Sequence, residues 1–307
     1  MINTARIQIL PTNIHSFVTE IGATLRNLYG PSAETAYLDT AKASYSRLIR
    51  HPDIRVWTCG QTETRGLLVC LVRRGIAHIT LFHVLKSEIS KGIEDALLNT
   101  ATAELRAEGV RGIIGEFVRY RPLAVERPLT SLGFTRFDRQ MMIADVGNPN
   151  LALNVPSSTS PCGDRDTLAA GVLVDAYEGH PSRSLHPEAQ DETGAISFLE
   201  TFRAGGFGAT MPSLYRIYGT NDDCRGMIAA AEAAPDVGFI LHVASRRSAQ
   251  GTGIGSQLVR EVAAIFRSGG YSRIALGVTC GNPAERLYAR LGFDHLMPVE
   301  TYAWWAA

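Results

Sequence analysis

Apolar and polar residues alternate along this chain with two periods, and together these periods predict a mixed α/β protein. Period-two alternation over 237–243 predicts a strand, whereas the apolar spacing over 253–268 is that of a helix with one buried face. Gly269-Gly270 follow this helix, as C-terminal capping residues do. A strand, a short helix and a last strand complete the pattern at 274–278, 283–291 and 301–305.

The segments upstream show the same two periods. Helical spacing predicts helices over 166–178 and 193–203. Alternation on both sides of Asn221-Asp222-Asp223 predicts a hairpin of 214–219 with 226–230. In the first half of the chain, three strands of a predicted meander lie at 54–60, 66–73 and 76–83.

The chain also repeats itself. Residues 92–118 align without gaps with 253–279, and Gly92, Leu97 and Gly109 then match Gly253, Leu258 and Gly270. The tripeptide LGF follows each copy, at 132–134 and at 291–293. Two helix–glycine–strand units in register, each followed by LGF, indicate a duplicated domain.

Length agrees with a duplication, because 307 residues suit two domains of about 150. We expect domains at 1–146 and 164–307. Between them, 147–163 is rich in Pro, Asn and Ser and is predicted to be a linker, with a first strand of the second domain at 151–155.

Composition narrows the classes of function. Thirty basic residues balance thirty acidic ones, which argues against partners that need a basic surface, such as nucleic acid or an anionic membrane. The five cysteines lie far apart, a pattern of reduced thiols rather than of a disulfide scaffold. No signal-like N-terminus and no apolar run of about 20 residues is apparent. A cytoplasmic protein is expected.

The segment with candidate chemistry is 243–256, VASRRSAQGTGIGS, where a strand runs into a glycine-rich loop that opens a helix. Glycines let the backbone approach a ligand closely, and a helix N-terminus favours an anion such as pyrophosphate. A dinucleotide fingerprint would require glycine at Ser256, and a P-loop would require a lysine. A plain glycine-rich turn is the structural alternative.

Two segments together resemble the signatures of the GNAT superfamily of N-acetyltransferases. Gln250, Gly253 and Gly255 fit its pyrophosphate loop, Q/R-x-x-G-x-G/A. NPAERLYARLGF at 282–293 is similar to its second signature, A-x-x-L-Y-x-x-L-G-F. The resemblance covers 164–307 and, with the repeat, implies two tandem GNAT-like domains, each a mixed and mostly antiparallel sheet flanked by helices. It also implies acetyl-CoA as the acyl donor and a small-molecule primary amine as the acceptor.

The resemblance further assigns contacts with acetyl-CoA. Backbone groups of 243–245 would pair with the pantetheine arm in a splay between the fourth and fifth strands, and N–H groups of 250–256 would hold the pyrophosphate. Asn282 would contact the arm from the far side, and Arg246 and Arg247 are candidates for the 3′-phosphate. The residues predicted to bind the cofactor are Val243, Ala244, Ser245, Gln250, Gly251, Thr252, Gly253, Ile254, Gly255, Ser256 and Asn282.

The family reaction is direct attack of a neutral amine on the thioester. Because an alkyl amine titrates near 10.4, a base must take its proton, and the thioester oxygen needs a hydrogen-bond donor. Tyr288 stands where the family keeps a tyrosine that donates to the departing thiolate. We therefore predict a catalytic role for Tyr288, the alternative being a ring that only packs in the core.

The base is left open. Alignment on Gln250 places the side chains of Val237, Phe239 and Leu241 on the face of the strand toward the acceptor cavity. Since side chains alternate between the two faces, His242 would point away from the cavity and is expected to be a core or supporting residue, unless a bulge changes the register. The other candidates lie in the polar loop 178–192: His180, His186 and Glu188. His180 and His186 are six residues apart and form no metal-binding pattern, so no metal is expected.

The first copy departs from this pattern. Ile89 and Glu94 replace Gln250 and Gly255, and Leu129 stands at the position of Tyr288. Carboxylates at a helix start favour the helix dipole and repel phosphate, so this copy is predicted to be a degenerate GNAT-like domain that has lost CoA binding.

Three functional hypotheses remain. The first is an acetyl-CoA-dependent N-acetyltransferase. The second is a non-catalytic acyl-CoA-binding, regulatory module whose N-terminal half engages a partner. The third is transfer of the acyl group to an oxygen atom, or transfer of an acyl group larger than acetyl. The bulk of the side chains around Phe239 and Leu241, at the acyl end of the site, would discriminate this hypothesis from the first. A monomer and a homodimer are both compatible with a tandem chain.

Overall fold

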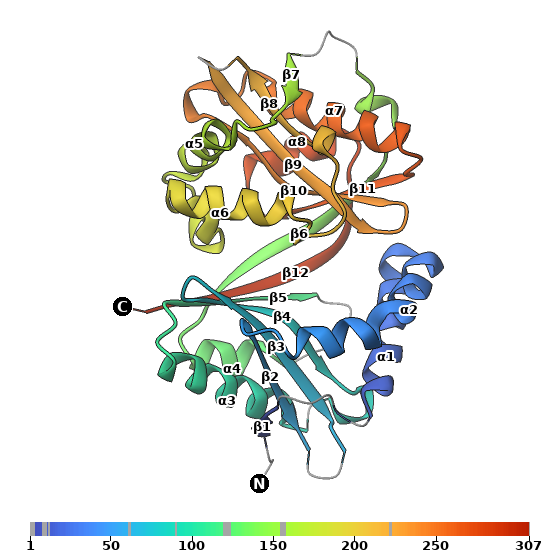
Figure 1. Ribbon diagram of the computed structural model, residues 1–307, viewed down its shortest axis with the longest axis vertical. Coiled ribbons are helices and arrows are strands. Elements are labelled where there is room, and N and C mark those ends of the chain that lie inside the picture. Colours follow the sequence, from blue (N-terminus) through green and yellow to red (C-terminus); the bar gives the residue numbers. More distant parts are fainter. Residues whose placement is uncertain are drawn as a thin grey trace. The chain divides into compact units, whose positions relative to one another are not determined.

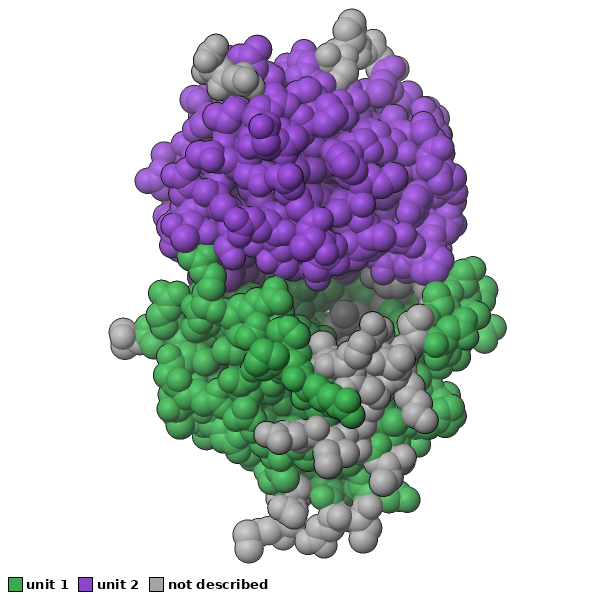
Figure 2. All heavy atoms as spheres, viewed as in Figure 1, with its two compact units in different colours: residues 1–138, 297–307 green, residues 139–296 purple. Residues whose placement is uncertain are grey.

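The computed structural model describes residues 4–7, 11, 13–60, 63–89, 91–118, 124–153, 158–220 and 223–306. The chain forms two compact units (Figure 2). Unit 1 comprises residues 1–138 and 297–307, and unit 2 comprises residues 139–296. Each unit is a mixed sheet flanked by helices, which confirms the predicted fold class.

Unit 1 has the strand order β1-β2-β3-β4-β5-β12, antiparallel except for the parallel pair β4–β5 (Figure 1). Its strands are β1 (Thr4–Arg6), β2 (Ile54–Cys59), β3 (Gly66–Arg73), β4 (Ile76–Val84), β5 (Gly112–Val118) and β12 (Asp294–Trp305). Its helices are α1 (Ile14–Tyr29), α2 (Pro31–Leu48), η1 (Lys86–Glu88), α3 (Ile93–Ala107) and α4 (Glu126–Ser131). Alternation on β2 sends Trp57 to the core shared with α3, and Val56 to the core shared with α1.

Unit 2 has the order β6-β11-β10-β9-β8-β7, antiparallel except for the parallel pair β10–β11. Its strands are β6 (Thr135–Asp145), β7 (Thr159–Pro161), β8 (Tyr215–Gly219), β9 (Cys224–Ala234), β10 (Val237–Ser245) and β11 (Arg273–Thr279). Its α-helices are α5 (Asp166–Tyr177), α6 (Glu192–Arg203), α7 (Ile254–Ser268) and α8 (Pro283–Arg290). The short 3₁₀ helices are η2 (Pro149–Leu151), η3 (Arg183–Leu185), η4 (Pro187–Ala189), η5 (Pro212–Leu214) and η6 (Arg247–Ala249). Helix α7 packs on one face of this sheet, and α5 and α6 pack on the other.

The two units repeat each other in backbone detail. A register shift leaves one extra residue on the fourth strand, Thr80 in unit 1 and Leu241 in unit 2. The following helix begins after a left-handed glycine, Gly92 in unit 1 and Gly253 in unit 2. Such local agreement supports the duplication read from the sequence.

The predicted domain division differs from the observed units at both ends. Residues 139–145 of β6 pair with β11 in unit 2, and residues 299–305 of β12 pair with β5 in unit 1. Each unit thus contains a strand from the other predicted domain. Periodicity identifies a strand but not its partner, because strand pairing is non-local.

The predicted first strand at 151–155 is wrong at its start. Leu151 ends η2, where Pro149 opens the turn and the Asn148 side chain accepts a 2.9 Å bond from the Asn150 N–H. The strand of this region is β7, and residues 154–157 lie outside the described residues, as do Asn221 and Asp222 of the predicted hairpin turn. In the described part of the chain, no helix is both long and apolar enough to cross a membrane.

Candidate functional site

Unit 2 contains a cavity of about 550 Å³ where β10 and β11 part. These parallel strands are paired only over 237–240 and 273–276. Beyond that point their C-terminal halves line the cavity, together with residues of α5, α7 and α8. The volume is that of a small-molecule site, and the splay predicted between the fourth and fifth strands is present.

One end of the cavity is the glycine-rich loop. Gly251 and Gly253 have φ angles of +79° and +92°, and a Cβ added at either would meet nothing within 4 Å. The backbone conformation, and not close packing, therefore favours glycine at these two positions. The space next to both residues is open. Helix α7 starts here with no side-chain cap and no acidic residue in its first turn, so no side chain of this turn competes with an anion for the first N–H groups of the helix.

His242 reaches the cavity because β10 has a bulge. Ile240 lies opposite Ala230 and His242 opposite Ala229, so Leu241 is an extra residue that reverses the side-chain parity. His242 lines the cavity, contrary to the expectation from simple alternation. Of the three residues expected to face it, Leu241 lines the cavity, whereas Val237 and Phe239 do not.

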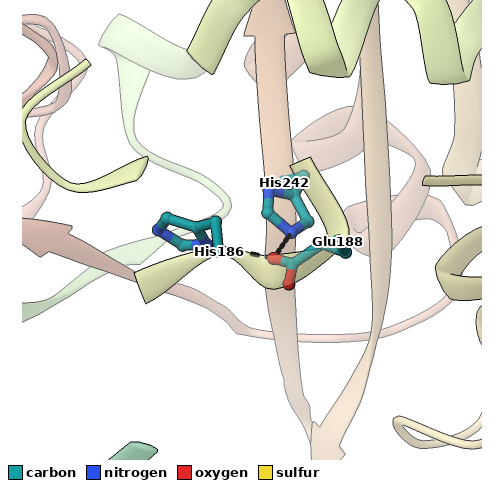
Figure 3. A group of neighbouring side chains, drawn as sticks. All are labelled: His186, Glu188 and His242. Carbon is teal, nitrogen blue, oxygen red and sulfur yellow. Dashed lines mark hydrogen bonds and ion pairs between the residues drawn. The ribbon is translucent and has the colours of Figure 1, made fainter. Parts of the chain in front are cut away.

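His242 belongs to a trio with His186 and Glu188 (Figure 3). One carboxylate oxygen, Glu188 Oε1, lies 2.9 Å from His242 Nε2 and 3.0 Å from His186 Nδ1. Burial alone would raise the pKa of Glu188, but hydrogen bonds from the two rings hold it well below its usual range. Burial lowers the pKa of His186. At neutral pH the trio therefore contains an ionised carboxylate beside a neutral His186 ring.

The ionised carboxylate also fixes the proton positions. It can only accept hydrogen bonds, so His186 donates from Nδ1 and His242 donates from Nε2. In the neutral His186 ring, Nε2 then carries the lone pair, and Figure 3 shows this nitrogen directed away from Glu188. The other ring nitrogen of His242, Nδ1, lies 3.5 Å from the hydroxyl of Tyr177. His186, which has its basic nitrogen at Nε2, is one of the residues that line the cavity.

Two further residues complete this end of the cavity. The Tyr177 ring contacts the rings of His180, His186 and His242, with centroids 5.5, 4.6 and 5.9 Å apart. Arg139 enters from β6, and its guanidinium crosses Gly277, where an added Cβ would lie 3.0 Å from Nη2. Burial lowers the Arg139 pKa. Sequence reasoning missed both residues, since Arg139 is found only when β6 is known to pair with β11.

Comparison with known proteins agrees with this geometry. Residues 182–293 match the Acetyltransferase (GNAT) family. The match lies within unit 2 and covers about a third of the chain. A GCN5-related N-acetyltransferase from Sphaerobacter thermophilus has a TM-score of 0.69 at 16% identity, covering 98% of this chain and 95% of that one.

A tandem GNAT protein from the clavulanic acid biosynthesis pathway has a TM-score of 0.60 at 14% identity, covering 100% of this chain and 99% of that one. At sequence identities this low, structural similarity shows a shared fold and does not show a shared activity. No curated protein sequence matches the chain. The family match within unit 2 supports an acyl-CoA-dependent acyltransferase in general.

Nearly all the residues predicted to bind the cofactor line the cavity of unit 2: Val243, Ala244, Ser245, Gln250, Gly251, Gly253, Ile254, Gly255, Ser256 and Asn282. Thr252 is not among the lining residues, and its hydroxyl instead donates to the Ala249 carbonyl at 2.7 Å. Arg246 donates to the Cys224 carbonyl, and Arg247 pairs with Asp175 and Glu178. The two arginines are therefore engaged locally.

Tyr288 and Asn282 lie on the α8 side of the cavity. Burial raises the pKa of Tyr288, so the residue is a neutral phenol whose hydroxyl can donate a hydrogen bond. The Asn282 side chain caps α8 by accepting a 2.8 Å bond from the Ala284 N–H. Its amide nitrogen lies 3.2 Å from His180 Nε2, which connects the start of α8 to the polar loop.

The corresponding part of unit 1 contains two packed aromatic side chains and a buried carboxylate. Pairing of β4 with β5 also stops early, at Ile79 and Gly115. Beyond that point Phe82 and Phe117 pack edge to face with centroids 5.7 Å apart. Glu94, at the position of Gly255, is buried at the start of α3.

Proposed function

We propose that unit 2 is an acetyl-CoA-dependent N-acetyltransferase, which transfers the acetyl group to a primary amine of a small molecule by direct attack on the thioester. The observation that carries the proposal is one cavity that is lined by the open N-terminus of α7, by Tyr288, and by the two histidines of the His–Glu–His trio. The helix N-terminus suits a pyrophosphate, and the trio suits proton transfer.

Acetyl-CoA would enter along the splay. Its pyrophosphate would accept hydrogen bonds from the N–H groups at 250–256, and its pantetheine arm would pair with β10 at 243–245, where β11 has moved away. This arrangement leads the thioester toward the point where the two strands part. Backbone N–H groups of β10 beyond Ile240 then provide donors for the oxygen that becomes negative in the transition state.

The acceptor amine would lose its proton to His186 Nε2. Glu188 stabilises the imidazolium that forms, because its ionised carboxylate accepts a hydrogen bond from His186 Nδ1. His242 holds the same oxygen from the other side and so fixes its position. The nitrogen of the acceptor forms the new amide bond, the C–S bond breaks, and Tyr288 donates a hydrogen bond or a proton to the departing thiolate.

The test is amine-dependent release of the CoA thiol from acetyl-CoA, measured over a panel of primary amines and the corresponding alcohols. The proposal predicts release with at least one amine, an N-acetylated product of matching mass, and no release with its alcohol. A chain that binds acetyl-CoA but releases no thiol with any amine would instead support a non-catalytic module. Release with the alcohols would support transfer to oxygen.

A further inference from the structure

The trio at the acceptor end of the cavity has a second chemical capacity. Its donor atoms, His186 Nδ1, Glu188 Oε1 and His242 Nε2, all lie within 4.8 Å of one another. They come from two separate segments, the 3₁₀ turns before α6 and strand β10, and their side chains are 15%, 18% and 5% exposed. Figure 3 shows both rings turned toward the same carboxylate.

Two imidazoles and one carboxylate form a donor set for a first-row divalent ion such as Zn²⁺, which they bind at about 2.0–2.2 Å. Small movements of the side chains would bring the three atoms to that distance from one point. Mg²⁺ and Ca²⁺, in contrast, prefer sites made of oxygen atoms. With three protein ligands and a cavity beside them, the remaining coordination positions would be open to water or a ligand.

The proton positions are compatible with metal binding. A neutral ring that ligates an ion through one nitrogen carries its proton on the other nitrogen. His242, bound through Nε2, would then direct its Nδ1–H toward the Tyr177 hydroxyl, which lies 3.5 Å away. This is the supporting contact that metal-binding histidines usually have. The Arg139 cation near the trio opposes a second cation, so the affinity would lie well below that of a structural zinc site.

We propose that His186, Glu188 and His242 bind a Zn²⁺-class divalent ion in the cavity of unit 2. Binding through His186 Nδ1 moves the ring proton to Nε2, which removes the lone pair that the proposed reaction uses. The ion therefore inhibits acetyl transfer. This second consequence rests on the proposed function, whereas the binding itself does not.

The test is calorimetric titration of Zn²⁺ into the chelator-treated chain near neutral pH, in a Cys280→Ser background that removes the exposed thiol. We expect one ion per chain and no uptake of Mg²⁺. Glu188→Gln and His186→Gln should each weaken binding about tenfold or more. The control is His295→Gln, which removes an exposed histidine paired with Glu285 and should leave the affinity unchanged. The visible absorption of Co²⁺ provides a second readout of nitrogen ligation.

The site proposal fails if the folded chain takes up no Zn²⁺ or Co²⁺. It also fails if both trio variants keep the affinity of the starting protein, because the ion then lies elsewhere. The effect of the ion on acetyl transfer is tested separately from its binding. Zinc that binds through the trio without slowing acetyl transfer would support the site and contradict the role of His186 as the base.

Discussion

His242 Nε2 and Glu188 Oε1 lie 2.9 Å apart, although 54 residues separate them in the chain. The pair forms because the extra residue Leu241 turns His242 toward the cavity, while the turns before α6 bring Glu188 to the same place. One bulge thereby converts a strand histidine into part of a candidate active site.

We expect the negative charge of Glu188 to affect kcat strongly and to have little effect on the binding of acetyl-CoA. Glu188→Gln keeps the side-chain shape but removes the charge that stabilises the His186 imidazolium, so kcat should fall by about 10²–10⁴-fold. The Kd for acetyl-CoA should stay unchanged, because Glu188 is neither among the residues predicted to bind the donor nor among those that line the cavity. Steady-state kinetics and calorimetry test both, with the exposed Glu200→Gln as the matched control. A kcat close to that of the control would show that the proton leaves by another route.

The pH profile should report His186. Burial, and in smaller part the charge of Arg139, lower its pKa, so the ring stays unprotonated and basic below the ordinary histidine value of about 6.5. We expect kcat/KM to rise with pH through a midpoint below that value. Arg139→Gln removes one cause of the lowering, so the midpoint should move to higher pH. A midpoint that stays or moves down would contradict an action of Arg139 on the base.

Tyr288 should act on the departing thiolate. Tyr288→Phe keeps the buried ring and removes only the hydroxyl, so acetyl-CoA should bind as before while kcat falls by about 10²-fold. Single-turnover release of thiol measures this step. Tyr271→Phe is the control, since that hydroxyl donates to Glu232 at 3.0 Å and does not line the cavity. Equal rates for the two variants would leave Tyr288 with a packing role only.

Asn282 should contribute to stability through its cap. Asn282→Ala leaves the start of α8 without a side-chain acceptor and should lower the free energy of unfolding by about 1 kcal/mol. Asn282→Asp keeps an acceptor and places a negative charge at a helix start, so it should restore most of that loss. Urea denaturation of the three proteins measures the difference. If alanine and aspartate destabilise equally, the cap is not the source of the effect.

The parts of the site that depend on local sequence could be predicted. The loop from Gln250 to Gly255 and the LGF repeat specify a local conformation, and left-handed Gly253 at the start of α7 follows from the spacing of the glycines. The resemblance to GNAT proteins then located Asn282 and Tyr288, which line the cavity.

The parts that depend on non-local pairing could not be predicted. Nothing near Arg139 indicates that β6 pairs with β11, and nothing near His242 shows that Leu241 is bulged. A shift of one residue reverses every following side chain, so simple alternation directed His242 away from the cavity. The trio likewise joins His186 and Glu188 of one segment to His242, which lies 54 residues after Glu188 and has no sequence spacing that relates it to them.

The central claim is that unit 2 holds the acetyl-CoA site, and titration of acetyl-CoA into the whole chain tests it most directly. Gly255→Glu introduces the residue that unit 1 has at Glu94, and the new Cβ would meet only Leu287 Cδ2 at 3.3 Å, so the fold should survive. The control, Ser87→Glu with Lys91→Glu, adds carboxylates to the corresponding exposed loop of unit 1. We predict one site per chain, lost in Gly255→Glu and kept in the control. No binding to the folded wild type, or unchanged binding in Gly255→Glu, would contradict the account.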